Sequence, residues 1–150
     1  MREKLKEAVD LFVEVMIYGT EQVTKRMEID IWKEYSPEQI QVLKILSDLG
    51  PLSNGKLAEY QNVHKSAISS RLKKLEEKGL IRTSRDENDH RVKVVELTEA
   101  GAEVLKTSNE AVNDSIEKIL GGHIDEEEID TFLRTFRKLK TILLIKENNE

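Results

Sequence analysis

The hydrophobic positions of this chain recur with a helical period over most of its length. Between residues 3 and 29 the apolar side chains lie mostly three or four positions apart. This spacing predicts an amphipathic helix, loosened near Gly19 and Thr20. The sequence EIDIWKEY, residues 28–35, then breaks the period.

A new helix is predicted over residues 37–49. Ser36 can cap its N-terminus, Pro37 suits the first helical position, and Gln39 lies three residues after the cap. A Gly-Pro pair ends the helix. The pattern turns three apolar side chains inward and places two at the flanks of that stripe: Ile40, Leu43 and Leu46, and Val42 and Ile45.

The next segment predicts two helices joined by a tight turn. Ser53 can cap a short helix, NGKLAEYQ, and a second helix extends from about Lys65 to Lys78, where Gly79 ends it. In the turn between them, Asn62 is the residue that most readily adopts the left-handed conformation.

The remaining pattern predicts a hairpin and two long helices. Residues 80–85 and 91–97 are extended runs joined by the polar sequence DENDH, which is typical of a hairpin. A helix is expected over residues 98–120. After the sequence GGH, Asp125 can cap a final helix, with Glu128 placed to complete a capping box.

The terminal helices carry more apolar surface than a small winged module can bury, and a second copy of the chain is its simplest partner. We therefore expect a mainly α fold, a winged helix-turn-helix with long N- and C-terminal helices that form a dimerisation domain. The 150 residues are expected to form a single domain. Its parts are the winged helix-turn-helix, residues 36–97, and the dimerisation helices, residues 1–30 and 98–146.

Composition narrows the function classes. The chain contains no cysteine, which excludes disulfides, thiolate metal sites and cysteine-based peroxide sensing, and its three histidines lie far apart, so neither a metal nor a cofactor is expected. The N-terminus begins basic and turns apolar, as a signal peptide does. However, Asp10 and Glu14 interrupt the apolar run and no small-residue cleavage site follows, so a signal peptide is not expected. No segment approaches the roughly 20 apolar residues that span a bilayer. We expect a cytoplasmic protein without a membrane partner.

Positive charge is concentrated in one stretch of an acidic chain. The chain has 24 Lys and Arg against 29 Asp and Glu, a net charge of −5. Between residues 61 and 85, seven basic residues face two acidic ones, a net +5 that leaves −10 for the rest. A local basic patch on an acidic body indicates one oriented binding face.

The predicted helix over residues 65–78 has two different faces. One arc is apolar, and the opposite arc carries small hydroxyls and lysines: Ser66, Ser70 and Lys73, flanked by Ala67, Ser69 and Lys74. Hydroxyls can bond base edges or phosphates, lysine reaches guanine acceptors or phosphates, and the first turn offers N–H groups to a phosphate. A solvated face is the alternative. The preceding short helix and turn favour DNA, because a helix-turn-helix places its second helix in the groove.

The hairpin would form the wing of this module. Asp89 and Arg91 lie two residues apart and would share one side of an extended strand, where they can form an ion pair. Such a pair would hold the guanidinium for insertion into a narrow minor groove. The alternative is an ordinary surface ion pair that contributes little.

The segment from Leu57 to Gly101 resembles the MarR family of winged-helix transcription regulators. The matching features are LAE, Ser66, Ile68, Ser69, LEEKGLI, the D-x-R at Asp89–Arg91 and the L-T-x-x-G at Leu97–Gly101. The resemblance implies a homodimer with interlocked terminal helices, recognition helices in successive major grooves and wing arginines in flanking minor grooves. It also implies repression relieved by a ligand bound between the dimer helices and the winged module.

Two positions depart from the family pattern. Ser70 stands where members often carry a basic residue. Arg71, the next residue, borders the apolar arc of the helix, so whether it contacts the DNA backbone or the bases stays open. Asn62 stands where many members have glycine. The candidate DNA-binding residues are Ser53, His64, Lys65, Ser66, Ala67, Ser69, Ser70, Arg71, Lys73, Lys74, Arg85, Asp89, His90 and Arg91.

The expected function is that of a dimeric, sequence-specific DNA-binding transcription regulator, a repressor released by a small-molecule ligand. Its partners would be double-stranded DNA with a pseudo-palindromic operator and a lipophilic or aromatic effector. Four side chains could line the effector pocket, with dimer core and helix connection as their alternative role: Met16, Tyr18, Trp32 and Tyr35. A winged-helix protein–protein adaptor is the alternative function. An enzyme is not expected, because no nucleophile–base pair, glycine-rich phosphate loop or metal-ligand spacing is visible.

Overall fold

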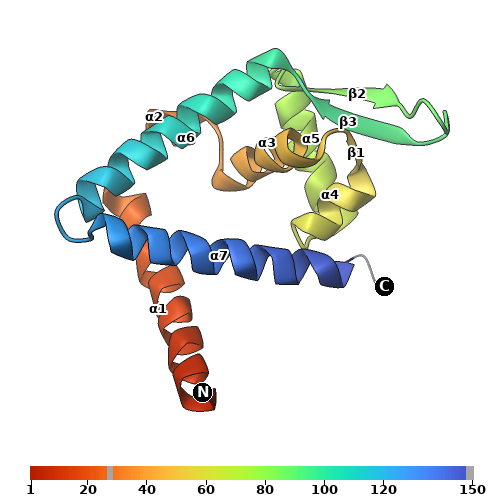
Figure 1. Ribbon diagram of the computed structural model, residues 1–150. Helices are drawn as coiled ribbons and strands as arrows, with labels where there is room; N and C mark the ends of the chain where they lie inside the picture. Colours follow the sequence, from red (N-terminus) through yellow and green to blue (C-terminus); the bar gives the residue numbers. More distant parts are fainter. Residues whose placement is uncertain (27–28, 148–150) are drawn as a thin grey trace. The chain divides into compact units, whose positions relative to one another are not determined.

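The computed structural model describes residues 1–26 and 29–147, and the fold is mainly helical as predicted. Residues 27 and 28, which include the predicted helical position Met27, lie outside the described part. The elements, shown in Figure 1, are α1 (Arg2–Arg26), α2 (Asp30–Glu34), α3 (Pro37–Leu49), β1 (Leu52–Ser53), α4 (Asn54–Tyr60), α5 (Lys65–Glu77), β2 (Ile81–Arg85), β3 (Lys93–Leu97), α6 (Glu99–Leu120) and α7 (Glu126–Glu147).

The N-terminal part differs from the prediction at two places. Helix α1 continues through Gly19 and Thr20, where a loosening was expected, and the Thr20 hydroxyl donates a hydrogen bond to the Met16 carbonyl at 2.6 Å. The segment that breaks the helical period contains the short helix α2. Five residues make little more than one turn, which is too short for a period to appear in the sequence.

Helix α3 begins as predicted. The Gln39 N–H donates to the Ser36 hydroxyl at 3.2 Å, and the Ser36 N–H donates to the Gln39 side chain at 2.9 Å, which completes a capping box. Leu43 and Leu46 are buried as predicted, but Val42, which was expected at the flank of the stripe, is fully buried and Ile40 only partly. The cause is that α3 packs against α4, α5 and β3 together, which buries a wider arc than one stripe.

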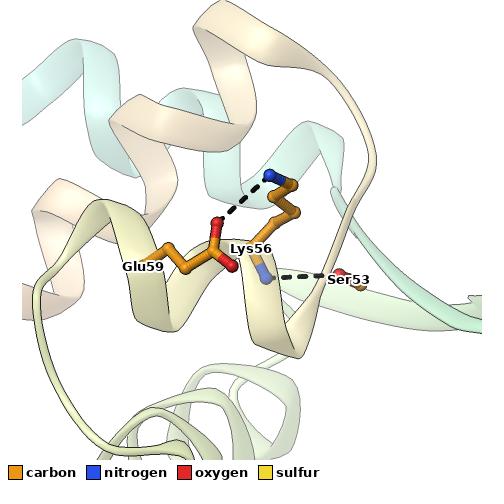
Figure 2. A network of polar contacts seen from close by, with 3 residues as sticks. All are labelled: Ser53, Lys56 and Glu59. Carbon is orange, nitrogen blue, oxygen red and sulfur yellow. Dashed lines mark hydrogen bonds and ion pairs between the residues drawn. The ribbon is translucent and has the colours of Figure 1, made fainter. Parts of the chain in front are cut away.

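The helix-turn-helix is confirmed in its local geometry. The Lys56 N–H donates to the Ser53 hydroxyl at 3.2 Å and begins α4, and Lys56 Nζ pairs with Glu59 at 3.1 Å (Figure 2). Asn62 has φ +50°, the left-handed conformation expected of the turn. Helix α5 packs against α4, and its buried side chains are Ile68, Leu72 and Leu75.

A three-stranded antiparallel sheet follows, in the order β1-β3-β2. The predicted hairpin is β2 and β3, which pair with Thr83 opposite Val95 and extend away from α5 (Figure 1). The sequence did not indicate β1, because a strand of two residues shows no alternation. Its pairing of Leu52 with Val95 places β1 at the edge of the sheet, where β1 also contacts α4 and Leu52 packs against the hydrophobic core.

The chain divides into two compact units, Met1–Val112 and Asn113–Glu150. In the second unit the predicted capping box at the start of α7 is confirmed: the Glu128 N–H donates to Asp125 at 2.9 Å, and the Asp125 N–H donates to Glu128 at 3.0 Å. The apolar side chains of α7 are exposed in the isolated chain, as are those of α1. None of the described helices has the length and apolarity required to cross a membrane.

The first turn of α6 lies in close contact with the backbone just before β2. The Thr98 hydroxyl donates to the Gly79 carbonyl at 2.7 Å and caps α6 by accepting from the Gly101 N–H at 3.1 Å. A Cβ on Gly101 would lie 2.1 Å from the Leu80 carbonyl oxygen and 2.7 Å from Leu97 Cδ1. Glycine is therefore required here by backbone proximity.

Replacing Gly101 with alanine is expected to lower the free energy of unfolding by about 3 kcal/mol, the upper end of the cost of overpacking. Gly19→Ala in α1 is the matched control, since nothing lies within 4 Å of its Cβ position. We expect the control to be neutral or stabilising by up to about 1 kcal/mol, because alanine favours helix. Urea unfolding followed by circular dichroism measures both; equal stability of the two variants would contradict the close contact.

Candidate nucleic-acid interface

Helix α5 presents the predicted two faces. Ile68, Leu72 and Leu75 are buried in the core. The opposite side is exposed and carries the predicted set, Ser66, Ser69, Ser70, Lys73 and Lys74, with Ala67 half-buried at its edge. The Ser69 hydroxyl donates to the Lys65 carbonyl at 2.8 Å, so its oxygen is left to accept. This face has small side chains that allow close approach of a polar surface.

The first turn of α5 offers backbone donors. His64 is the N-cap residue, but its side chain makes no capping hydrogen bond. The N–H groups of Ala67 and Ile68 donate to the His64 carbonyl, at 3.0 and 3.3 Å, whereas no acceptor within the described residues is recorded for those of Lys65 and Ser66. Free N–H groups and the positive end of a helix favour an anion such as a phosphate.

The basic residues of this region are not equally available. Three of them have acidic partners: Lys73 with Glu77 at 4.0 Å, Lys78 with Glu34 at 3.2 Å and Arg82 with Glu96 at 2.8 Å. The hydrogen bond from Arg82 holds the pKa of Glu96 below its ordinary value. Within the described residues, no ion pair is recorded for Lys65, Lys74, Arg85, Arg91 or Lys93. These five cations supply the usable positive charge of the surface.

Arg71 is half-buried, and its guanidinium is engaged within the protein. Its Nη1 donates to the Gln61 side-chain oxygen at 2.6 Å. Gln61 is the C-cap residue of α4 and donates through Nε2 to the Glu38 carbonyl at 2.8 Å and to Gln41 Oε1 at 3.0 Å. Gln61 was not predictable as a site residue from the sequence, because nothing in the local pattern indicates a partner ten residues away.

The loop of the wing is organised by two aspartates. Asp86 accepts hydrogen bonds from the N–H groups of Asn88, at 2.7 Å, and Asp89, at 3.4 Å, while its own N–H donates to the Val92 carbonyl at 2.9 Å. Arg85 Nη1 donates to the His90 carbonyl at 3.0 Å. These hydrogen bonds hold the exposed loop between β2 and β3 in one conformation. Asp86 was also missed from sequence, although an aspartate that opens a polar loop is a recognised turn signal.

The predicted geometry of Asp89 and Arg91 was wrong. Both residues lie in the loop before β3 and not on an extended strand, and no ion pair joins their side chains within the described part of the chain. Instead Asp89 Oδ1 accepts from the Arg91 backbone N–H at 3.0 Å. The chain turns here because the Val92 N–H donates to the Asp89 carbonyl. Asp89 therefore positions the Arg91 backbone and leaves the guanidinium exposed.

The four candidate effector residues have different surroundings. Met16 and Tyr18 are exposed on α1, at 55% and 61%. Tyr35 belongs to the hydrophobic core, lies 4.4 Å below the Lys78 ammonium and has its pKa raised by burial. Trp32 is half-buried and its indole N–H donates to the buried Ser108 hydroxyl of α6 at 3.2 Å. Tyr35 therefore has a packing role in the hydrophobic core of the first unit.

Comparison with known proteins places these features in one family. The model of the MarR family matches residues 35–93, which extend from the end of α2 to the start of β3. The chain is 43% identical over 141 residues to the uncharacterized HTH-type transcriptional regulator YdgG of Bacillus subtilis, covering 93% of this chain and 92% of YdgG. It is 32% identical to the HTH-type transcriptional regulator TcaR of Staphylococcus aureus, over 79% of this chain and 80% of TcaR.

Solved structures share the fold. A MarR family protein from Bacillus stearothermophilus superposes with a TM-score of 0.73 at 24% identity and covers 93% of this chain and 97% of that protein. A mutant of Staphylococcus aureus MepR bound to an oligodeoxyribonucleotide has a TM-score of 0.60 at 20% identity, with coverage of 88% and 97%.

Proposed function

The chain belongs to the MarR family and is a DNA-binding transcription regulator, and from this premise we propose that it binds a pseudo-palindromic operator as a homodimer. The observation that carries the proposal is the exposed face of α5, which bears hydroxyls and lysines and, in its first turn, N–H groups that have no acceptor among the described residues. Each α5 would enter a major groove, with the two half-sites related by the dimer axis. The likeness in fold to a MepR mutant that is bound to an oligodeoxyribonucleotide supports DNA as the partner.

We assign two kinds of DNA contact. The residues proposed to read the major groove or its phosphates are Ser53, His64, Lys65, Ser66, Ala67, Ser69, Ser70, Lys73 and Lys74, and those of the wing are Arg85, Asp89, His90 and Arg91. Lys73 would exchange its weak pairing with Glu77, at 4.0 Å, for a phosphate. Arg85 and Asp89 would hold the loop, while Arg91 reaches the minor groove.

The dimer is proposed from the exposed apolar side chains of the terminal helices. Phe132 is 56% exposed and stacks on Phe136 with a centroid distance of 4.0 Å, and Leu5 and Leu143 are 64% and 66% exposed. Exposed apolar side chains of this kind, along each of the two helices, mark interaction sites. Residues 1–30 and 98–146 would interlock with their counterparts, and residues 36–97 would bind DNA.

Regulation and location complete the proposal. The protein would repress its target in the cytoplasm and release DNA when a lipophilic or aromatic effector binds near Met16, Tyr18 and Trp32. The adaptor alternative is not favoured, because the exposed face of α5 is hydroxylated and cationic, whereas a protein-binding face would carry apolar side chains. Its relatives are transcription regulators, and we propose no catalytic activity.

Selection of bound fragments from random duplex DNA is expected to yield a two-fold-related motif with half-site centres about 10 bp apart, one helical turn. The affinity for that operator should fall steeply as salt rises, because each neutralised phosphate contributes about 0.9 to the slope of log K against log salt. Fluorescence anisotropy between low and physiological salt measures the slope. Binding indifferent to salt, or a motif without two-fold symmetry, would contradict the proposal.

Arg91→Ala is expected to weaken operator binding by about 1–3 kcal/mol, the scale of one positioned arginine contact. Its melting temperature should be nearly unchanged, because the guanidinium is exposed. Asp89→Ala should give a smaller loss, since it removes a hydrogen bond to the Arg91 backbone and not the contact itself. Arg82→Ala is the matched control on the same hairpin, because that guanidinium is engaged by Glu96. Anisotropy and thermal melts compare the variants; equal affinities of Arg91→Ala and wild type would rule out the wing contact.

Phe132→Asp is expected to convert the dimer to monomer, because it places a charge in the apolar surface of α7. Lys138→Asp, on the polar side of the same helix, is the control and should leave the dimer intact. Sedimentation equilibrium gives the masses. A Phe132→Asp variant that remained dimeric would exclude this surface from the dimer contact.

A further inference from the structure

We propose that Gln61 and Arg71 are positioning residues that set the rotation of α5 about its own axis, and that Arg71 acts within the protein and not on DNA. The inference rests on the proposed placement of α5 in the major groove. It is carried by the hydrogen-bond connections of one glutamine, which join three helices of the DNA-binding module.

The Gln61 amide connects α3, α4 and α5 at one point. It lies at the C-terminus of α4, accepts from Arg71 Nη1 of α5 at 2.6 Å, and donates to the Glu38 carbonyl and the Gln41 side chain of α3 at 2.8 and 3.0 Å. Arg71 lies near the middle of α5, so the tie acts on the body of the helix and not on its fraying end.

The chemistry of the partners permits one orientation of this amide. A guanidinium can only donate and a backbone carbonyl can only accept. The Gln61 oxygen must therefore face Arg71 and its nitrogen must face Glu38, which is the arrangement observed. A glutamate at position 61 would present an acceptor to the Glu38 carbonyl, and a lysine would present a donor to Arg71. Only an uncharged amide of this length serves both partners.

A directional contact adds what the apolar core does not provide. Ile68, Leu72 and Leu75 hold α5 by non-directional burial, which fixes its depth more strongly than its rotation. Hydrogen bonds weaken when their angle departs from linearity. Contacts to bases require side chains held within roughly 10–20° of their working direction. Because Ser70 directly precedes Arg71, rotation of the helix would displace the reading face at once.

Arg71 and Lys74 form a natural comparison on the same helix. Lys74 lies three residues after Arg71, is exposed, and has no recorded ion pair within the described residues. Arg71 is half-buried with its guanidinium engaged. If availability decides which cation contacts DNA, then of these two residues Lys74 neutralises a phosphate and releases counterions, and Arg71 does not.

The test compares Arg71→Met, Gln61→Met, the double variant and Lys74→Met, because methionine keeps an unbranched side chain without charge or strong hydrogen bonds. Anisotropy is measured across a salt series with the selected operator and with a scrambled duplex. Lys74→Met should reduce the salt slope by about one. Arg71→Met should leave the slope unchanged and lower the preference for operator over scrambled DNA about tenfold, the scale of coupling between contacting residues. Gln61→Met should lose the same preference, and the double variant should be no worse than either single one.

Three results would overturn the inference. A loss of slope in Arg71→Met equal to that of Lys74→Met would make Arg71 a phosphate contact. Additive losses in the double variant would mean that Gln61 and Arg71 do not act as a unit. A wild-type slope in Lys74→Met would instead contradict the proposed groove contact of α5, and the positioning role with it. Circular dichroism checks folding, and Gln61→Met tests the same tie should Arg71→Met not fold.

Discussion

The side of α5 that is proposed to face DNA is exposed because the opposite side is buried in the core. Ile68 and Leu75 are fully buried and Leu72 is 6% exposed. Burying each such side chain contributes about 1.5–3 kcal/mol, which exceeds the net worth of a typical surface hydrogen bond or ion pair. Rotating the helix far enough to expose these side chains would therefore cost more free energy than typical surface polar contacts could return. Which side chains face outward follows from this constraint, and within the range of rotation that the core allows, the polar contacts of the module set the exact orientation of the helix.

Features that depend on neighbouring residues were predictable from the sequence. The capping boxes of α3 and α7 require only a cap residue and a partner three positions later, and Asn62 adopts the left-handed turn conformation that its side chain tolerates. The two faces of α5 follow from helical spacing alone. The same local reasoning placed the hydroxyls and lysines of the candidate site on one exposed surface.

Features that depend on distant or very short segments were not predictable. Strand β1 has two residues and exists because β3 pairs with it. The partner of Arg71 is ten residues away and that of Trp32 is 76 residues away. Asp89 and Arg91 were assigned to a strand because their spacing fits one, but backbone hydrogen bonds of the loop turn the chain before β3 begins. Counting charges likewise could not distinguish Arg82, which forms an ion pair with Glu96, from Arg91, whose guanidinium is exposed.

The contact between Trp32 and Ser108 has a spectroscopic consequence. Trp32 is the only tryptophan of the chain, and its indole N–H is bound to a hydroxyl that is 2% exposed. When the excitation wavelength is one that only tryptophan absorbs, all of the fluorescence therefore comes from Trp32, at the contact between α2 and α6. An unfolding curve recorded in this way monitors the first compact unit, whereas far-ultraviolet dichroism averages over every helix. The wavelength of observation thus selects which part of the molecule is followed.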